Sequence, residues 1–209
     1  MVIFSGILYI CYIITNYTTT MKKIVLFLSV LCLTVMASAQ DHLKFKSIPI
    51  DGPKKAFIEQ LEKNEFHLID DNNFGASLRG RFTGRPVTAF VMTTTEGTVC
   101  RVAVNYDAPE HWMSLRLDFY TLLRSLSYKY GKAEELVQEF QFPYADGDGR
   151  ELEAFKNGKA RWYSRFVCPE GTIHMLISFN PMNQQPSLNI VYEDYLNCQR
   201  QDAINSEDL

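Results

Sequence analysis

Apolar and polar residues alternate along most of the chain, which is the two-residue period of β-strands with one buried face. Turn sequences such as Gly84-Arg85-Pro86, Glu96-Gly97 and Pro169-Glu170-Gly171 interrupt the alternation. The pattern predicts strands at about 66–70, 76–83, 86–95, 98–107, 136–142, 151–157, 160–168, 172–180 and 187–195. Because short turns join neighbouring strands, we expect antiparallel hairpins.

Two segments instead have the period of an amphipathic helix. The first follows Asp51-Gly52-Pro53, whose proline suits a first helical turn, and ends near Asn64. The second follows a capping box formed by Asp107 and Glu110, and it ends at Gly131. Each predicted helix precedes one run of strands.

This order predicts an α+β fold: a single antiparallel β-sheet built from two helix-plus-meander repeats, with both helices packed on one face. The repeats span about 40–107 and 108–198. Half-domains of that size are too small to be stable apart, so residues 40–198 are predicted to form a single domain. The polar segment 199–209 is predicted to be a frayed tail.

The start of the chain has the pattern of an export signal. Met21-Lys22-Lys23 precedes an apolar run from Ile24 to Ala37, and Ala37-Ser38-Ala39 supplies the small residues of a cleavage site. We expect a signal peptide at 21–39, with 1–20 as an upstream extension and Met21 as the initiator. The alternative is a membrane-anchored protein that begins at Met1.

Cleavage after residue 39 would give an exported protein, periplasmic or extracellular, without a membrane span in the mature chain. The 209 residues carry 21 Lys and Arg against 24 Asp and Glu, and this mild acidity argues against a nucleic-acid partner. Hydrophobic residues make up 46% of the chain, enough to build a core and to exclude disorder.

Three cysteines follow the predicted cleavage site, and an odd number leaves one without an intramolecular partner. Cys100 shares a strand face with apolar residues, which predicts a buried free thiol. Cys168 precedes a turn and Cys198 follows the last strand, so an antiparallel layout brings both to one end of the sheet. We therefore predict a Cys168–Cys198 disulfide.

Two further motifs lack residues that their chemistry requires. Gly75 and Gly80 have the spacing of a phosphate-binding loop, but Arg81-Phe82 stands where lysine and a hydroxyl residue are needed. Gly80 is better explained by a bulge or a close strand contact. Asp146 and Asp148 lie in a turn that lacks the other ligands of a calcium loop. No cofactor is predicted.

Enzymatic signatures are also weak. The four histidines are far apart and without zinc-ligand spacing, so no metal site is predicted. The one imaginable triad combines Cys168 or Cys100 with His174 and Asp194, without a local nucleophile motif. We predict no catalytic residues, and a cysteine-histidine hydrolase remains the alternative.

Strand parity divides the predicted sheet into two faces. Under the helices it places Leu78, Phe82, Val102, Val104, Trp162, Phe166, Ile173, Met175, Ile177, Phe179, Leu188, Ile190 and Tyr192. The opposite face collects a set predicted to bind a partner: Arg79, Arg81, Arg101, Arg161, Tyr163, Arg165 and His174. Arginine and tyrosine are enriched at protein interfaces, so we expect a binding module for an acidic protein, a glycan or another polyanion.

The competing interpretation is that a sheet exposed on one side simply needs polar residues, with arginine and glutamate paired across strands. A structural role in the cell envelope then remains open.

A family resemblance supports the binding interpretation. The segments Ser47-Ile48-Pro49-Ile50-Asp51-Gly52 and Lys129-Tyr130-Gly131-Lys132, with Tyr120 and Leu123 before the latter, occur within the doubled helix-plus-meander order. In these features the chain resembles exported bacterial proteins with the tandem fold of the β-lactamase inhibitor protein. The resemblance implies a non-enzymatic protein that binds through the open face of its sheet, and it carries across no inhibitory residues and no β-lactamase partner.

Overall fold

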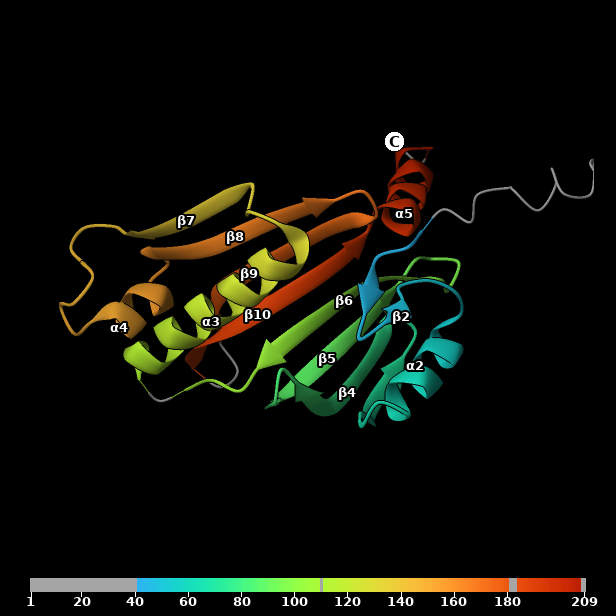
Figure 1. Ribbon diagram of the computed structural model, residues 1–209, viewed down its shortest axis with the longest axis horizontal. Coiled ribbons are helices and arrows are strands. Elements are labelled where there is room, and N and C mark those ends of the chain that lie inside the picture. Colours follow the sequence, from blue (N-terminus) through green and yellow to red (C-terminus); the bar gives the residue numbers. More distant parts are fainter. Residues whose placement is uncertain (1–40, 110, 181–183, 208–209) are drawn as a thin grey trace, which may run out of the picture. The chain divides into compact units, whose positions relative to one another are not determined.

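A computed structural model describes residues 41–109, 111–180 and 184–207 (Figure 1). The chain from His42 onward forms one compact unit, whose fold is described below. The upstream extension at 1–20 and the signal peptide at 21–39 lie outside the described residues.

One large antiparallel sheet dominates this unit. Its eight strands run in the order β3-β4-β5-β6-β10-β9-β8-β7. Each run of four strands stays in chain order, and the two runs join where β6 pairs antiparallel with β10. The α+β class and the large antiparallel sheet predicted from the sequence are confirmed. The strands are β3 (His67–Asn72), β4 (Gly75–Phe82), β5 (Arg85–Thr93), β6 (Val99–Tyr106), β7 (Glu135–Phe140), β8 (Ala160–Cys168), β9 (Gly171–Asn180) and β10 (Gln185–Asp194).

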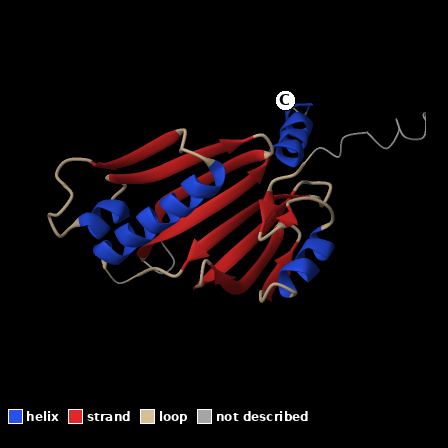
Figure 2. Ribbon diagram, viewed as in Figure 1, coloured by secondary structure: helices blue, strands red, loops and turns tan. Residues whose placement is uncertain are grey.

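Three helices pack on one face of this sheet, and a fourth lies at its end (Figure 2). Helix α2 (Lys54–Glu62) contacts β3 and β4, whereas α3 (Trp112–Tyr130) and α4 (Glu151–Lys156) cover the half formed by β8, β9 and β10. Helix α5 (Tyr195–Glu207) follows β10 directly. Among the helices described, none is both long and apolar enough to cross a membrane.

The core lies between the sheet and the three covering helices. Phe57 and Leu61 of α2 and Leu115 and Phe119 of α3 are fully buried there. The sheet contributes alternate residues, as strand parity predicts. The predicted core residues are buried, with Phe82 partly buried against the same cluster and Phe179 half-buried.

The segment 151–157, predicted as a strand, instead contains helix α4. Glu151, Ala154 and Phe155 are its buried residues, and spacings of three and four place them on one helical face. The buried Glu151 carboxylate accepts the Gly147 backbone N–H at 2.8 Å. Gly158, with φ of 65°, follows the end of this helix, so the hairpin expected between the predicted strands 151–157 and 160–168 does not form.

The polar segment 199–209, predicted as a tail, is helical in its described part, because α5 extends to Glu207. A second unpredicted element is a two-stranded sheet of β1 (Lys44–Phe45) and β2 (Ile48–Pro49). It buries Phe45 and Ile48 in the core. The large sheet is therefore accompanied by a small one, where the sequence predicted a single sheet.

The predicted capping box does not form around Asp107. Helix α3 begins only at Trp112, its N-cap is His111, and no side chain caps it. The Asp107 carboxylate binds Arg79 instead. Gly131 ends α3 with φ of 85°, as predicted for a residue in the left-handed half of backbone space.

Candidate functional site

The face of the sheet opposite α2, α3 and α4, here called the open face, is covered by no described helix. Backbone register fixes which side chains lie side by side on it. One row crosses the sheet through Ser77, Phe90, Ala103, Val191, His174, Arg165 and Glu135. The adjacent row runs through Arg79, Thr88, Asn105, Asn189, Leu176, Tyr163 and Val137.

The parity of these rows places all the predicted partner-binding residues on the open face: Arg79, Arg81, Arg101, Arg161, Tyr163, Arg165 and His174. They are not gathered at one point. Arg79 and Arg81 lie on β4, while Arg161 and Arg165 lie on β8, five positions away in the strand order. The set therefore forms two clusters on the open face, one towards each edge of the sheet, with Arg101 near the centre.

In the β4 half, the Arg79 guanidinium donates two hydrogen bonds to Asp107, at 2.7 and 2.5 Å. These bonds lower the pKa of Asp107 and raise that of Arg79. Near the centre, Arg101 Nη2 lies 2.9 Å from Glu193 Oε2. Burial works to lower the pKa of Arg101, but the charge and hydrogen bond of Glu193, together with the neighbouring cysteines, raise it overall.

In the β8 half, both arginines face carboxylates. Arg161 Nη2 is 3.2 Å from Glu135 Oε1, and Arg165 Nη2 is 3.2 Å from Glu134 Oε2. Between them, the Tyr163 hydroxyl and His174 Nδ1 form a 2.8 Å hydrogen bond. Burial lowers the pKa of His174 below 6.5. The Arg165 charge also lowers this pKa, whereas the Glu193 charge raises it. Because the net pKa is lowered, this histidine is neutral at pH 7.

The open face is consequently balanced in charge rather than basic. Four of its five arginines pair with an acidic side chain, the pairing that the competing interpretation expects of a polar outer face. The fifth, Arg81, donates to the Gly84 carbonyl. Exposed pairs of this kind contribute about 0–1 kcal/mol each to stability. They also remove the net positive potential that would attract a polyanion.

Apolar residues are the feature of the open face that sequence reasoning missed. A hollow of about 540 Å³ extends from the β3–β4 turn across β5 to β6. Its lining includes Asp70, Phe74, Ser77, Phe90, Met92 and Ala103. Phe74 is 88% exposed and Phe90 42% exposed. The signal was present in the even-numbered positions of β5, where Phe90 and Met92 share the open face with the predicted arginines.

Amide and hydroxyl side chains fill the centre of the open face beside this hollow. Asn105 Nδ2 donates to Asn189 Oδ1 at 2.7 Å, and Asn189 Nδ2 donates to Ser178 Oγ at 2.8 Å. Asn105 also donates to the buried Ser187 hydroxyl, at 3.2 Å. The ladder ties β6, β10 and β9 together, so the junction of the two strand runs is held by side chains as well as backbone.

The structure does not bring together the predicted Cys168–Cys198 pair, because Cys168 ends β8 whereas Cys198 lies against β6. Cys198, in α5, donates from Sγ to the Cys100 carbonyl oxygen in β6, 3.3 Å away. Strands β10 and β9 separate β6 from β8. Three strand spacings place Cys168 about 14 Å from Cys100, beyond the reach of a disulfide with Cys198. Cys100 is buried, as predicted.

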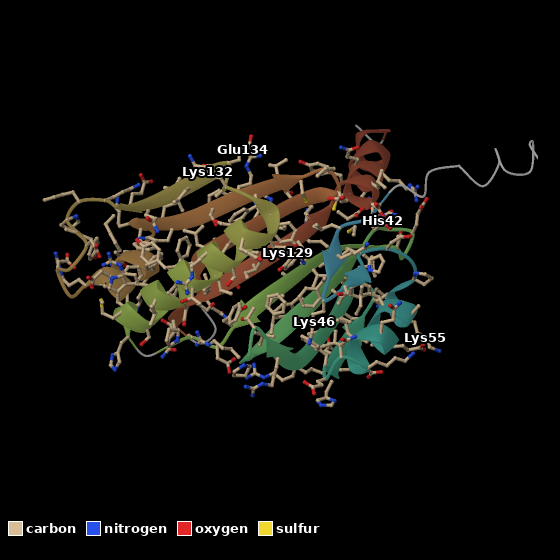
Figure 3. The ribbon with its side chains drawn as sticks, in the orientation of Figure 1. His42, Lys46, Lys55, Lys129, Lys132 and Glu134 are labelled. Carbon is tan, nitrogen blue, oxygen red and sulfur yellow. The ribbon has the colours of Figure 1, made fainter. Side chains whose placement is uncertain are left out.

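The imagined catalytic triad does not assemble. His174 lies on the open face, whereas Asp194 lies on the opposite face and is fully buried. The Asp194 carboxylate accepts the Leu43 N–H at 2.9 Å and the Asn197 N–H at 3.0 Å, and it lies 3.1 Å from His42 Nδ1. Figure 3 shows His42 beside the start of α5. Asp194 thus secures the N-terminal segment and α5 to the sheet.

Within the described ranges, no three His, Cys, Asp or Glu side chains are placed to share a metal ion. The chain matches no family model, no curated protein and no solved structure.

Proposed function

We propose that this protein is an exported, non-enzymatic binding module that holds a protein partner on its open face. The observation that carries the proposal is the hollow edged by Phe74 and Phe90. An exposed aromatic pair beside a cavity is costly to leave in water and suits an apolar side chain of a partner. Arginines and Tyr163 elsewhere on the same face are residue types that interfaces favour.

A protein partner fits the open face better than a polyanion does. Acidic neighbours already occupy the Arg79, Arg101, Arg161 and Arg165 guanidinium groups. A polyanion would have to displace those carboxylates, whereas a folded partner can use the exposed edges of the pairs and place an apolar group in the hollow.

The resemblance to the tandem fold of the β-lactamase inhibitor protein points the same way. We propose that the two halves of the unit are structural repeats: α2 with β3 to β6, and α3 with β7 to β10. Their strand orders mirror each other about the β6–β10 pair. The second half differs in its longer helix and in α4, which is inserted between β7 and β8. In a sheet doubled this way, both repeats contribute to one continuous docking face.

Export is the third part of the proposal, and it rests on the signal pattern at 21–39. Mass spectrometry of the natural N-terminus tests it directly. The expected first residue is Gln40, and a mature protein that retains residues before Met21 would contradict it.

A matched set of surface variants tests the docking face. Phe90→Asp places a charge beside the hollow, and a second variant carries Arg79→Glu, Arg161→Glu and Arg165→Glu together. Tyr128→Asp is the control, because Tyr128 is 95% exposed on α3, on the helical side of the sheet. Phe90 and Tyr128 are exposed, so the melting temperatures of Phe90→Asp and Tyr128→Asp should stay within about 2 °C of the unmodified protein. The arginine variant places glutamates beside Asp107, Glu134 and Glu135, so its melting temperature should fall further, and its binding is compared at a temperature where it is fully folded.

Each variant is used as bait after chemical crosslinking in intact cells. We expect one partner protein that the unmodified bait and Tyr128→Asp retain and that Phe90→Asp loses. Loss from the arginine variant alone, reversed by high salt, would identify a polyanion. A partner lost only from Tyr128→Asp would move the site to α3, and no exported partner for any bait would leave a structural role in the envelope.

A further inference from the structure

Two cysteines from distant parts of the chain meet at the end of the sheet. Cys198 Sγ donates a hydrogen bond to the Cys100 carbonyl oxygen at 3.3 Å. Both residues are 7% exposed. They lie 98 positions apart in the sequence, so the fold alone brings them together.

Local structure holds each thiol in place. Cys100 occupies an irregularity in β6, where Thr93 pairs with Val99 but Met92 pairs with Arg101. This leaves Cys100 as the extra residue of a β-bulge, with its Sγ 3.6 Å from the Met92 carbonyl oxygen. The bulge therefore fixes the thiol beside α5 rather than in the regular alternation of the strand.

Helix α5 is held in place at Asn197, the residue before Cys198. The Asn197 side-chain amide donates to the carbonyl oxygens of Val99, at 3.1 Å, and of Ile50, at 3.0 Å. Residues 197 and 198 thus bind the backbone of residues 99 and 100. Two neighbouring contacts define the position of α5 against β6 and keep the thiols adjacent.

We propose that Cys100 and Cys198 are a disulfide-forming pair, which closes when the protein meets an oxidised disulfide donor such as that of an exported compartment. A disulfide needs an S–S distance of about 2.05 Å. Cys198 Sγ already lies 3.3 Å from the Cys100 carbonyl oxygen, so rotation of the two side chains with a small movement of the first turn of α5 brings the sulfurs to this distance.

The reaction is thiol–disulfide exchange and needs no other reactant. The hydrogen bond from Cys198 lowers the pKa of Cys100, whereas the pKa of Cys198 is raised, so Cys100 is the attacking thiolate. Its sulfur bonds to one sulfur of the donor and expels the other as a thiolate. Cys198 then gives up its proton, its sulfur attacks Cys100 Sγ, and the second donor thiolate leaves. The protein loses two electrons and two protons, and the donor becomes two thiols.

In an exported protein this bond would tie the last helix to the central strand β6. Closing a loop of this length restricts the unfolded chain strongly, so oxidation is expected to raise the melting temperature by about 5–15 °C. Cys168 takes no part, because its Sγ donates to the Gly171 carbonyl at 3.2 Å on the far side of β9 and β10.

Oxidation in the cell rests on the proposed export, whereas the pairing of Cys100 with Cys198 does not. The experiment tests these two claims separately. The full chain, including its first 39 residues, is expressed and isolated with thiols blocked by iodoacetamide, and its peptides are mapped by mass spectrometry without reduction. A second sample is purified reduced and equilibrated with oxidised glutathione. Cys100→Ser and Cys168→Ser variants receive the same treatment.

We expect a linked Cys100–Cys198 peptide in both samples and a blocked thiol at Cys168. Oxidation should raise the melting temperature of Cys168→Ser but not that of Cys100→Ser. A link that forms only with glutathione would support the pair and contradict export. Three free thiols after glutathione treatment, or a Cys168–Cys198 link, would overturn the pair.

Discussion

Replacing Gly80 with alanine tests the packing of the sheet at a point where the structure leaves no room. Gly80 lies on the core-facing parity of β4, opposite Phe66, which immediately precedes β3. A Cβ added at Gly80 would lie 2.5 to 2.8 Å from three atoms of the Phe66 ring. Phe66 is fully buried, and its ring centroid lies 6.1 Å from that of Phe45. The strand contact predicted for Gly80 from the sequence is confirmed as a glycine covered by an aromatic ring.

The cost follows from these distances. Ordinary carbon contacts begin near 3.4 Å, so the Phe66 ring must retreat by about 1 Å into packed neighbours. Overpacking of this kind costs about 1–3 kcal/mol. Alanine also restricts the unfolded chain more than glycine does, and this effect raises the free energy of unfolding by about 0.4–1 kcal/mol. Gly80→Ala should therefore lower the free energy of unfolding by about 1–2 kcal/mol.

Urea unfolding followed by tryptophan fluorescence measures this change, because Trp112 and Trp162 are both buried in the core. Ser77→Ala, on the open face of the same strand, is the control and should change stability by less than about 0.5 kcal/mol. Phe66→Leu makes room for the new methyl group, so the double variant should cost about 1 kcal/mol less than the sum of the single changes. Strict additivity, or a neutral Gly80→Ala, would refute the packing described for this face.

Three further predictions concern charged and phenolic groups. Asp194→Ala leaves two backbone N–H groups buried without an acceptor and should cost about 2–5 kcal/mol in urea unfolding; a cost below 1 kcal/mol would contradict this role. Burial raises the pKa of Tyr106 to about 12 against about 10 in the unfolded chain, so its contribution to stability should be complete below pH 10 and disappear towards pH 12, which unfolding of Tyr106→Phe between pH 9 and 12 checks. The hydrogen bond from Arg79 lowers the pKa of Asp107, so this pair stabilises the fold above about pH 3.8 and loses its effect as the pH falls further. Because both side chains are exposed, Asp107→Asn should cost less than about 1 kcal/mol at pH 7 and nothing at pH 2, and an equal cost at both values would contradict the pairing.

Strand and helix periodicity predicted most of the fold because its elements are regular. The alternation around Val102 and Val104 identified both the strand and its buried face, and the three- and four-residue spacing of Leu115, Phe119 and Leu122 identified the long helix. These elements bury apolar side chains at fixed periods, so the pattern carries the information directly.

The errors arose where polar groups or short elements decide the structure. Helix α5 buries Asn197, which is held by three hydrogen bonds rather than by an apolar stripe, and a polar sequence gave no sign of it. Helix α4 has only six residues, too few to distinguish its period from that of a strand. The cysteine pairing failed for a related reason, because α5 directs Cys198 towards β6.

The candidate site was predicted only in part. Parity placed Arg79, Arg161 and their companions on the correct side of the sheet, but their carboxylate partners depend on register and on loop residues such as Asp107 and Glu134. The hollow beside Phe90 requires the β3–β4 turn to carry Phe74 next to β5, which no local pattern encodes.

Photo-crosslinking from a benzophenone amino acid placed at position 90 tests the docking proposal most directly. The same group at position 128 is the comparison, because both sites are exposed but lie on opposite faces of the sheet. The account predicts that irradiation of living cells joins one partner protein to position 90 and not to position 128. A partner joined only through position 128, or an exported protein that binds a partner without any adduct at position 90, would contradict it.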